Sequence, residues 1–192
     1  MNFRNDNLNG DISFMTSLLS LEVWFPGERT LTIPSSVVDL SLQGCSPRAR
    51  VMGTERITSL HSYHVGASIA LCPNLRTLSL FYNRISESVP FTWVELTALT
   101  NMYVDVDYVD PGFRFPPNLV EMTLRVSHSS IDGAALTQLT RLQSLDLTAQ
   151  NETPSDLSAL VLLTNVHTLF FKVAALPTSV VDCDVWVSSD LD

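Results

Sequence analysis

A recurring pattern of apolar residues runs through the chain and constrains its fold more than any other feature. The clearest copy is NLRTLSLFYNRI at residues 74–85. Its fixed positions are Leu75, Leu78, Leu80, Asn83 and Ile85. Nine copies can be aligned in one frame, with first positions at residues 18, 37, 57, 75, 99, 119, 142, 166 and 180. The copy that begins at residue 57 is the poorest, because Ser62 takes an apolar position. A repeat of this kind predicts a chain of similar units stacked on one another.

Each copy contains two apolar residues separated by one outward position, as in Leu78 and Leu80. This alternation predicts a short β-strand that buries one of its two faces. One such strand cannot bury its apolar face alone. Neighbouring copies are therefore expected to pair as a parallel sheet, which also satisfies the backbone hydrogen bonds between repeats.

The repeat resembles that of the leucine-rich-repeat family, whose pattern is L-x-x-L-x-L-x-x-N-x-L. The resemblance covers residues 1–187, and residues 188–192 are expected to form a C-terminal tail. It implies an α/β-type repeat solenoid, a horseshoe with a parallel β-sheet on its concave face and a mostly extended or short helical convex side. It also implies that Asn83 turns the chain inward. Because the first residues already fit the second half of a repeat, the N-terminal cap is expected to be missing.

Two styles of repeat occur in the chain. Residues 85–90 and the following Trp93 resemble the 24-residue L-x-G-x-[IVL]-P class of plant receptor ectodomains and protozoan surface antigens, with Glu87 in place of glycine. In the second style a proline precedes the repeat, and the copies are residues 33–42, 115–124 and 176–185. These resemble the short repeats of bacterial effectors and of amoebal Pro-Ser-Val proteins. Proline presets φ and favours an extended entry into the strand, so little helix is expected there.

The charge and hydropathy of the chain disfavour nucleic acid and membranes as partners, and its cysteines disfavour a metal site. The net charge of −9 disfavours nucleic acid and anionic membrane surfaces, both of which need a basic patch. No apolar run approaches the length of a membrane span, so no membrane insertion is expected. The cysteines Cys45, Cys72 and Cys183 have no metal-ligand spacing, and we expect reduced, mostly buried thiols.

The residues between the buried leucines are expected to face outward on the concave sheet. On this face carboxylates outnumber basic groups, and aromatic side chains are interleaved with them. Exposed aromatics among charges are typical of interface anchors, which favours a protein partner of basic or amphipathic character. The alternative is that they are ordinary solvent-facing strand residues. The predicted partner-binding residues are Trp24, Phe81, Tyr103, Asp105, Glu121, Asp146, Phe170 and Trp186.

No catalytic motif accompanies the repeats. His61 and His64 lie three residues apart, but no third ligand stands at a matching distance, so no metal and no cofactor is expected. The leading interpretation is a non-enzymatic protein-binding or scaffold module. Two alternatives are the substrate-recognition part of a larger ubiquitin ligase or effector enzyme, and an ectodomain fragment of a cell-surface receptor or antigen. The expected location is cytoplasmic for a complete chain, and extracellular or at the cell surface if a signal peptide precedes Met1.

Overall fold

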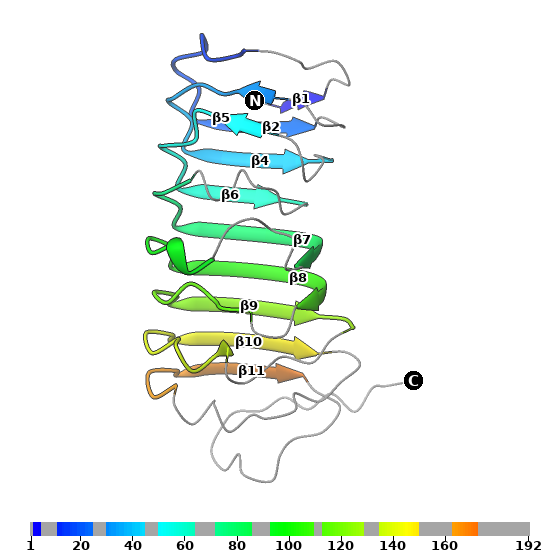
Figure 1. Ribbon diagram of the computed structural model, residues 1–192, viewed down its shortest axis with the longest axis vertical. Helices are drawn as coiled ribbons and strands as arrows, with labels where there is room; N and C mark the ends of the chain where they lie inside the picture. Colours follow the sequence, from blue (N-terminus) through cyan, green and yellow to red (C-terminus); the bar gives the residue numbers. More distant parts are fainter. Residues whose placement is uncertain are drawn as a thin grey trace.

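A computed structural model shows the protein as an elongated stack of parallel strands (Figure 1). The structure describes residues 2–4, 11–24, 30–44, 50–63, 72–85, 93–109, 113–128, 135–149 and 163–172.

Within the described residues the main sheet contains nine strands, all paired in parallel with their neighbours. In sheet order they are β1 (Asn2–Arg4), β2 (Ser20–Trp24), β4 (Asp39–Gln43), β6 (Ser59–Ser62), β7 (Thr77–Ile85), β8 (Asn101–Val109), β9 (Glu121–Val126), β10 (Ser144–Ala149) and β11 (Thr168–Lys172). The order follows the sequence, so each repeat adds one strand beside the previous one. This is the topology of a parallel β-solenoid, and the expected solenoid is confirmed.

Eight of the nine predicted repeats contain a strand that begins two residues after the first position of the repeat. The repeat that begins at residue 57 is no exception, and Ser62 is buried in β6 in the place of an apolar residue. The ninth copy, at residue 180, lies outside the described residues. The strands β7 and β8 are longer than the others, and their carboxyl ends curl away from the sheet (Figure 1). The register of β7 on β8 shifts on both sides of Asn83, close to the point where the chain was predicted to turn.

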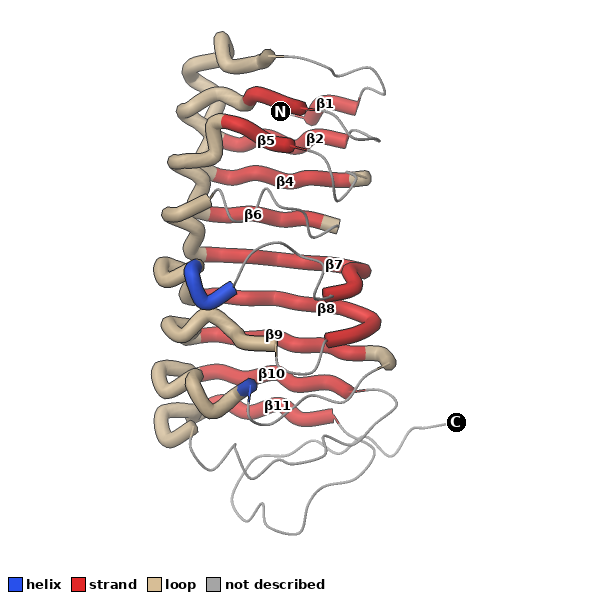
Figure 2. The backbone as a smooth tube through the Cα atoms, in the orientation of Figure 1, coloured by secondary structure: helices blue, strands red, loops and turns tan. Residues whose placement is uncertain are grey.

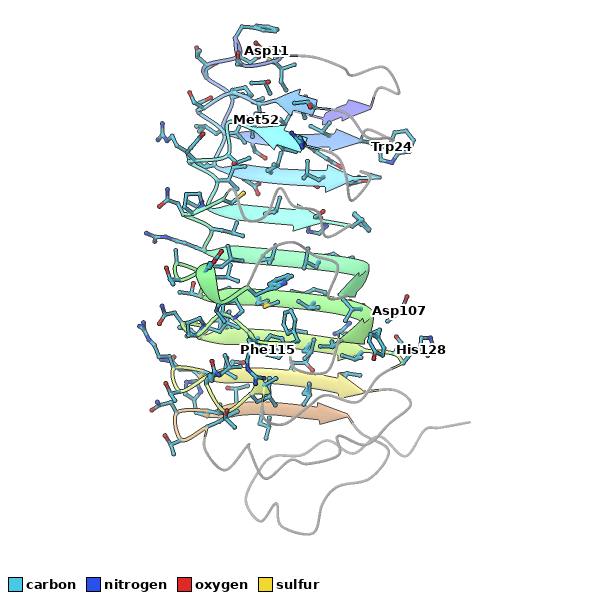
Figure 3. All side chains as sticks on the ribbon, viewed as in Figure 1. Asp11, Trp24, Met52, Asp107, Phe115 and His128 are labelled. Atoms are coloured by element: carbon cyan, nitrogen blue, oxygen red, sulfur yellow. The ribbon has the colours of Figure 1, made fainter. Side chains whose placement is uncertain are left out.

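The core lies on one side of the main sheet and is formed by alternate residues of its strands. In β2 and β4 the buried residues are Leu21 and Val23, and Leu40 and Leu42; in β9 they are Met122, Leu124 and Val126. Trp93, Phe113 and Phe115 pack edge to face behind the middle strands, with ring centroids 5.4 and 4.9 Å apart. Phe115 lies over the centre of the stack in Figure 3 and is fully buried.

A tight turn precedes the strand in most repeats and places the first repeat position in the core. The amide of Leu75 donates to the carbonyl of Cys72, and that of Leu142 donates to the carbonyl of Leu139. Asparagines in these turns also link one repeat to the next. The side-chain amides of Asn74, Asn118 and Asn165 donate to the carbonyls of Glu55, Thr97 and Thr140, at 2.7, 2.8 and 2.6 Å. Residues 74, 118 and 165 each stand immediately before a first repeat position, so the same bond recurs between different pairs of repeats.

The side of the solenoid opposite the main sheet is mostly extended where it is described (Figure 2). A second parallel sheet of two strands, β3 (Thr30–Thr32) and β5 (Arg50–Met52), lies in this layer. Leu31 and Val51 point from it into the common core. Among the described residues, helix is limited to short 3-10 pieces such as Trp93–Glu95. The extended alternative for this side therefore holds in the described residues, whereas the horseshoe curvature and a helical convex side stay predictions.

Candidate functional site

The candidate site is the outer face of the main sheet, the side of the strands that points away from the core. The strand register lines up its residues in three rows that cross the strands. The first row is Ser20, Asp39, Ser59, Thr77, Asn101, Glu121, Ser144 and Thr168. The second is Glu22, Ser41, His61, Ser79, Tyr103, Thr123, Asp146 and Phe170. The third is Trp24 and Gln43 and, further along, Phe81, Asp105, Arg125, Thr148 and Lys172.

Four aromatic or imidazole rings form one continuous cluster in the middle of this face. This aromatic row consists of His61, Tyr63, Phe81 and Tyr103. The ring of Phe81 lies 4.7 Å from that of His61 and is stacked 4.8 Å from that of Tyr103. Tyr63 closes the cluster beside His61 and Phe81, at 5.6 and 5.7 Å. All four side chains are partly buried, so the row joins β6, β7 and β8 and still reaches solvent.

A small residue in β7 explains how Phe81 reaches both neighbours. His61, Ser79 and Tyr103 are consecutive members of the second row, whereas Phe81 belongs to the third. Strands are about 4.8 Å apart, so rings on β6 and β8 would leave a gap of two strand spacings over β7. The short side chain of Ser79 leaves this gap open. Phe81 packs against both rings, with a tilted contact to His61 and a stacked contact to Tyr103.

A cation continues the stack on the next strand. The guanidinium carbon of Arg125 in β9 lies 5.5 Å from the centroid of the Tyr103 ring, within the range of a cation–π contact. Its Nη2 atom is 4.0 Å from a carboxylate oxygen of Asp146 in β10. The side chains of Arg125 and Asp146 are 47% and 32% exposed, so this ion pair is solvent-screened and weak. Together these contacts connect side chains on five adjacent strands.

Carboxylates elsewhere on the outer face are oriented by neutral donors from neighbouring strands. Gln43 donates to Glu22 at 2.6 Å, and Ser20 donates to Asp39 at 3.1 Å. Asn101 donates its side-chain amide to Glu121 at 2.5 Å. The donors to Asp39 and Glu121 carry no charge, so these two bonds limit the rotamers of the carboxylates without pairing them with a cation.

Trp24 lies at the carboxyl end of β2, apart from the aromatic row (Figure 3). Its indole packs over Gly44, whose backbone has a φ of +65°. A β-carbon at residue 44 would come 2.6 Å from the indole nitrogen of Trp24. The indole thus lies close against the backbone of the adjacent strand, and the absence of a side chain at Gly44 permits this contact.

The predicted site residues therefore divide into groups. Phe81 and Tyr103 are brought into direct contact, and Asp146 joins them through Arg125. Asp105 stands between Phe81 and Arg125 in the third row, and Glu121 belongs to the first row. The backbone of Phe170 pairs beside Asp146 in β11, but its side chain and the whole of Trp186 lie outside the described residues.

Sequence reasoning placed His61, Tyr63 and Arg125 on the outer face but not among the binding residues. The signal that was available is the row position: His61 shares a row with Tyr103, and Arg125 shares one with Phe81. The contacts of Phe81 with His61 and Tyr103 connect the two rows. The repeat pattern alone does not predict these contacts. The turn asparagines Asn74, Asn118 and Asn165 were also not predicted.

The other residues that the sequence analysis considered for metal binding and thiol chemistry are only partly described. No group of three or more His, Cys, Asp and Glu residues there is arranged to hold a metal ion. Cys72 is buried, as expected for a small hydrophobe, and burial raises the pKa of its thiol to about 11. His64, Cys45 and Cys183 lie outside the described residues. No helix found among the described residues has the length and apolar character to cross a membrane.

Comparisons with models of protein families, with curated proteins and with solved structures give no match. The interpretation of the outer face thus depends on its own geometry and on the repeat. Its main features are a packed aromatic row, a cation at one end of the row, and oriented carboxylates around it.

Proposed function

We propose that this chain is a binding module of the leucine-rich-repeat type that holds a protein partner on the outer face of its main sheet. The observation that carries the proposal is the aromatic row of His61, Tyr63, Phe81 and Tyr103 on the solvent side of the sheet. Half-buried aromatic rings gain free energy when a partner covers their remaining exposed surface. Tyr, Phe and Arg are also enriched in the cores of protein interfaces.

The close packing of the row favours a binding surface over a set of ordinary solvent-facing strand residues. Phe81 is held between His61 and Tyr103, and Tyr103 is covered in turn by Arg125. Side chains that are already ordered lose less conformational entropy on binding, which raises affinity for a given buried area. The parallel strands beneath them form a continuous, hydrogen-bonded platform, so the row behaves as one preorganised surface.

The repeat supports the leucine-rich-repeat part of the proposal. In this family the residues between the buried leucines form the concave binding face, and here the same positions form the outer face. The described layer behind the sheet is extended, as the proline-containing repeats imply. A partner covering β6 to β10 would contact residues from five consecutive repeats.

Site-specific photo-crosslinking tests the proposal. A photoreactive phenylalanine analogue replaces Thr123 on the outer face or, in a separate protein, Glu55 in a turn at the edge of the solenoid. Both proteins are irradiated in an extract of the source cells, and the crosslinked bands are compared. We expect a discrete crosslinked partner from position 123 that is absent from position 55.

The same crosslinking is repeated with Phe81→Ala and Tyr103→Ala together in the protein labelled at position 123. The partner band should be lost, because both ring surfaces are removed. The matched control is the pair Ser41→Ala and Thr168→Ala, which changes outer-face residues of β4 and β11, outside the strands that the partner covers, and should retain the band. Circular dichroism of each variant verifies that the sheet is intact. Equal bands with and without the aromatic rings would refute the proposal.

A further inference from the structure

The charge of the outer face identifies a class of partner for the proposed binding site. The carboxylates in the three rows of this face are Glu22, Asp39, Asp105, Glu121 and Asp146. Arg4 and Lys172 occupy the same rows, but they belong to the first and last described strands. Within the rows from β2 to β10, Arg125 is the one Lys or Arg residue. Acidic groups thus surround an aromatic row.

We propose that the occupant of this face is a basic, extended protein segment that lies across β7 to β10. It sets an apolar side chain against Phe81 and Tyr103 and places Lys or Arg side chains near Glu121 and Asp146. This inference rests on the proposed function and names the partner that it would hold. Complementary charge on such a segment also speeds its association and makes binding dependent on salt.

The hydrogen bonds of the carboxylates support a cationic partner. Asp39 and Glu121 accept from Ser20 and Asn101, both of which are neutral. A neutral donor orients a carboxylate and leaves its full charge available to an incoming ammonium or guanidinium group. The acidic groups are therefore preorganised for cations in the same way as the rings are preorganised for apolar groups.

Other occupants suit this face less well. A second copy of the chain would bring the same carboxylates against one another, and nucleic acid would bring phosphates against them. A sugar stacks on the open face of an aromatic ring, but Phe81 already packs against the rings of His61, Tyr63 and Tyr103. The exposed ring surface that remains suits packing by aliphatic and aromatic side chains.

Arg125 provides a test with a defined sign. It is a cation among the acidic groups and holds Asp146 through a loose contact of 4.0 Å. A basic segment would be repelled by Arg125 and would have to compete with it for Asp146. Removing the charge of Arg125 therefore strengthens binding of a basic segment, whereas it would weaken binding of an acidic one.

The experiment uses a displayed library of random 12-residue peptides, selected on the full chain and counter-selected on the Phe81→Ala variant. We expect the retained peptides to be enriched in Lys and Arg together with at least one large apolar residue. A synthetic copy of the most enriched peptide is then titrated against each variant by fluorescence anisotropy. Its affinity should fall several-fold as salt rises from about 50 to about 200 mM, because the pairing is electrostatic.

The variants separate charge from shape. Glu121→Gln should lower the affinity for the peptide by about two- to fivefold, as expected for one exposed ion pair. Arg125→Gln should raise this affinity by a similar factor. Phe81→Ala should weaken it by about tenfold or more, as expected for an interface anchor. Glu55→Gln is the matched control for charge, because it makes the same substitution in a turn away from the face, and it should have little effect.

The outcomes distinguish the two proposals. Selection of acidic or uncharged peptides that still depend on Phe81, or weaker binding on Arg125→Gln, would overturn the basic partner and leave the binding face supported. Failure to select any peptide that depends on Phe81 would count against the basic partner and, together with negative crosslinking, against the proposed function.

Discussion

Gly53 is held in a backbone conformation that residues with a side chain rarely adopt. Its φ is +84°, and a β-carbon there would lie 2.6 Å from the carbonyl oxygen of Ile33. The obstacle is backbone, which cannot rotate away as a side chain can. We predict that Gly53→Ala lowers the free energy of unfolding by about 1–3 kcal/mol. Denaturant unfolding would measure this, with Met52→Ala as the control. Met52 is 49% exposed, so the control should cost about 0.5 kcal/mol or less.

Because of Cys72, the free energy of unfolding of the protein should fall at alkaline pH. Burial raises the pKa of its thiol from 9.0 to about 11, so the folded protein favours the neutral thiol. Its contribution is complete below pH 9 and is lost as the pH rises toward 11, because the unfolded chain ionises first. The difference between the two pKa values corresponds to about 2–3 kcal/mol.

We therefore predict that the wild type loses more stability than Cys72→Ala between pH 8 and 10.5. Denaturant unfolding of both proteins at the two pH values measures the difference, since other groups titrate in both. Parallel losses in the two proteins would show that Cys72 does not carry the effect. The variant itself should be less stable at pH 8, because it leaves a small cavity in the core.

The repeat pattern predicted which single residues face the core and which face solvent, but not how the outward ones meet. Leu78 and Leu80 are buried and Ser79 and Phe81 face outward, as their alternation implies. The stack of Phe81 between His61 and Tyr103 depends on residues about twenty positions away on either side, and on the small size of Ser79. Contacts of this kind arise from packing between repeats, which spacing within one repeat does not encode.

At the scale of elements, the turns before the strands contribute more than the sequence suggested. Asn118 donates to the carbonyl of Thr97 and accepts from Arg141, and so links three successive repeats. We predict that Asn118→Ala lowers the free energy of unfolding by about 0.5–1.5 kcal/mol, since it removes two exposed hydrogen bonds, of which the one from Arg141 is long at 3.3 Å. Thermal unfolding followed by circular dichroism would measure the change.

The repeat with Ala98 at the equivalent position offers the reciprocal experiment. By the spacing of the other turns, Ala98→Asn would donate to the carbonyl of Pro73. This substitution should raise stability modestly, or at least cost nothing, while Asn118→Ala lowers it. If Asn118→Ala and Asn74→Ala both left the melting temperature unchanged, the turn asparagines would have no net role in holding the repeats together.

The strands of the main sheet were predictable and the second sheet was not. Alternating apolar residues mark β2, β4 and β6 because each of these strands buries one face completely. The strands β3 and β5 each have a single buried residue, Leu31 and Val51, between two more exposed ones. Three residues are too few for a period to be recognised, so these strands become evident through their pairing.

At the scale of the whole molecule, the described strands contact their neighbours in the stack and little else. Stability in such a solenoid is approximately a sum over repeats and over the interfaces between adjacent repeats. A defect in one repeat should therefore weaken its neighbours more than distant repeats. This is also why a poor copy, such as the one with Ser62, folds between two good ones.

Leu124 provides a test of this locality, because it is fully buried in β9 near one end of the described stack. We predict that Leu124→Ala costs about 2–5 kcal/mol in the repeats that surround it. Amide hydrogen exchange should show a loss of protection in β8, β9 and β10, with much smaller changes in β2 and β4. Thr123→Ala is the matched control, since it alters the adjacent residue of the same strand on the outer face and should leave protection nearly unchanged.

A uniform loss of protection from β2 to β10 would instead mean that the stack unfolds as one cooperative unit. In that case a partner bound at the aromatic row would stabilise every repeat equally, whereas local unfolding would confine its stabilising effect to β6 through β10.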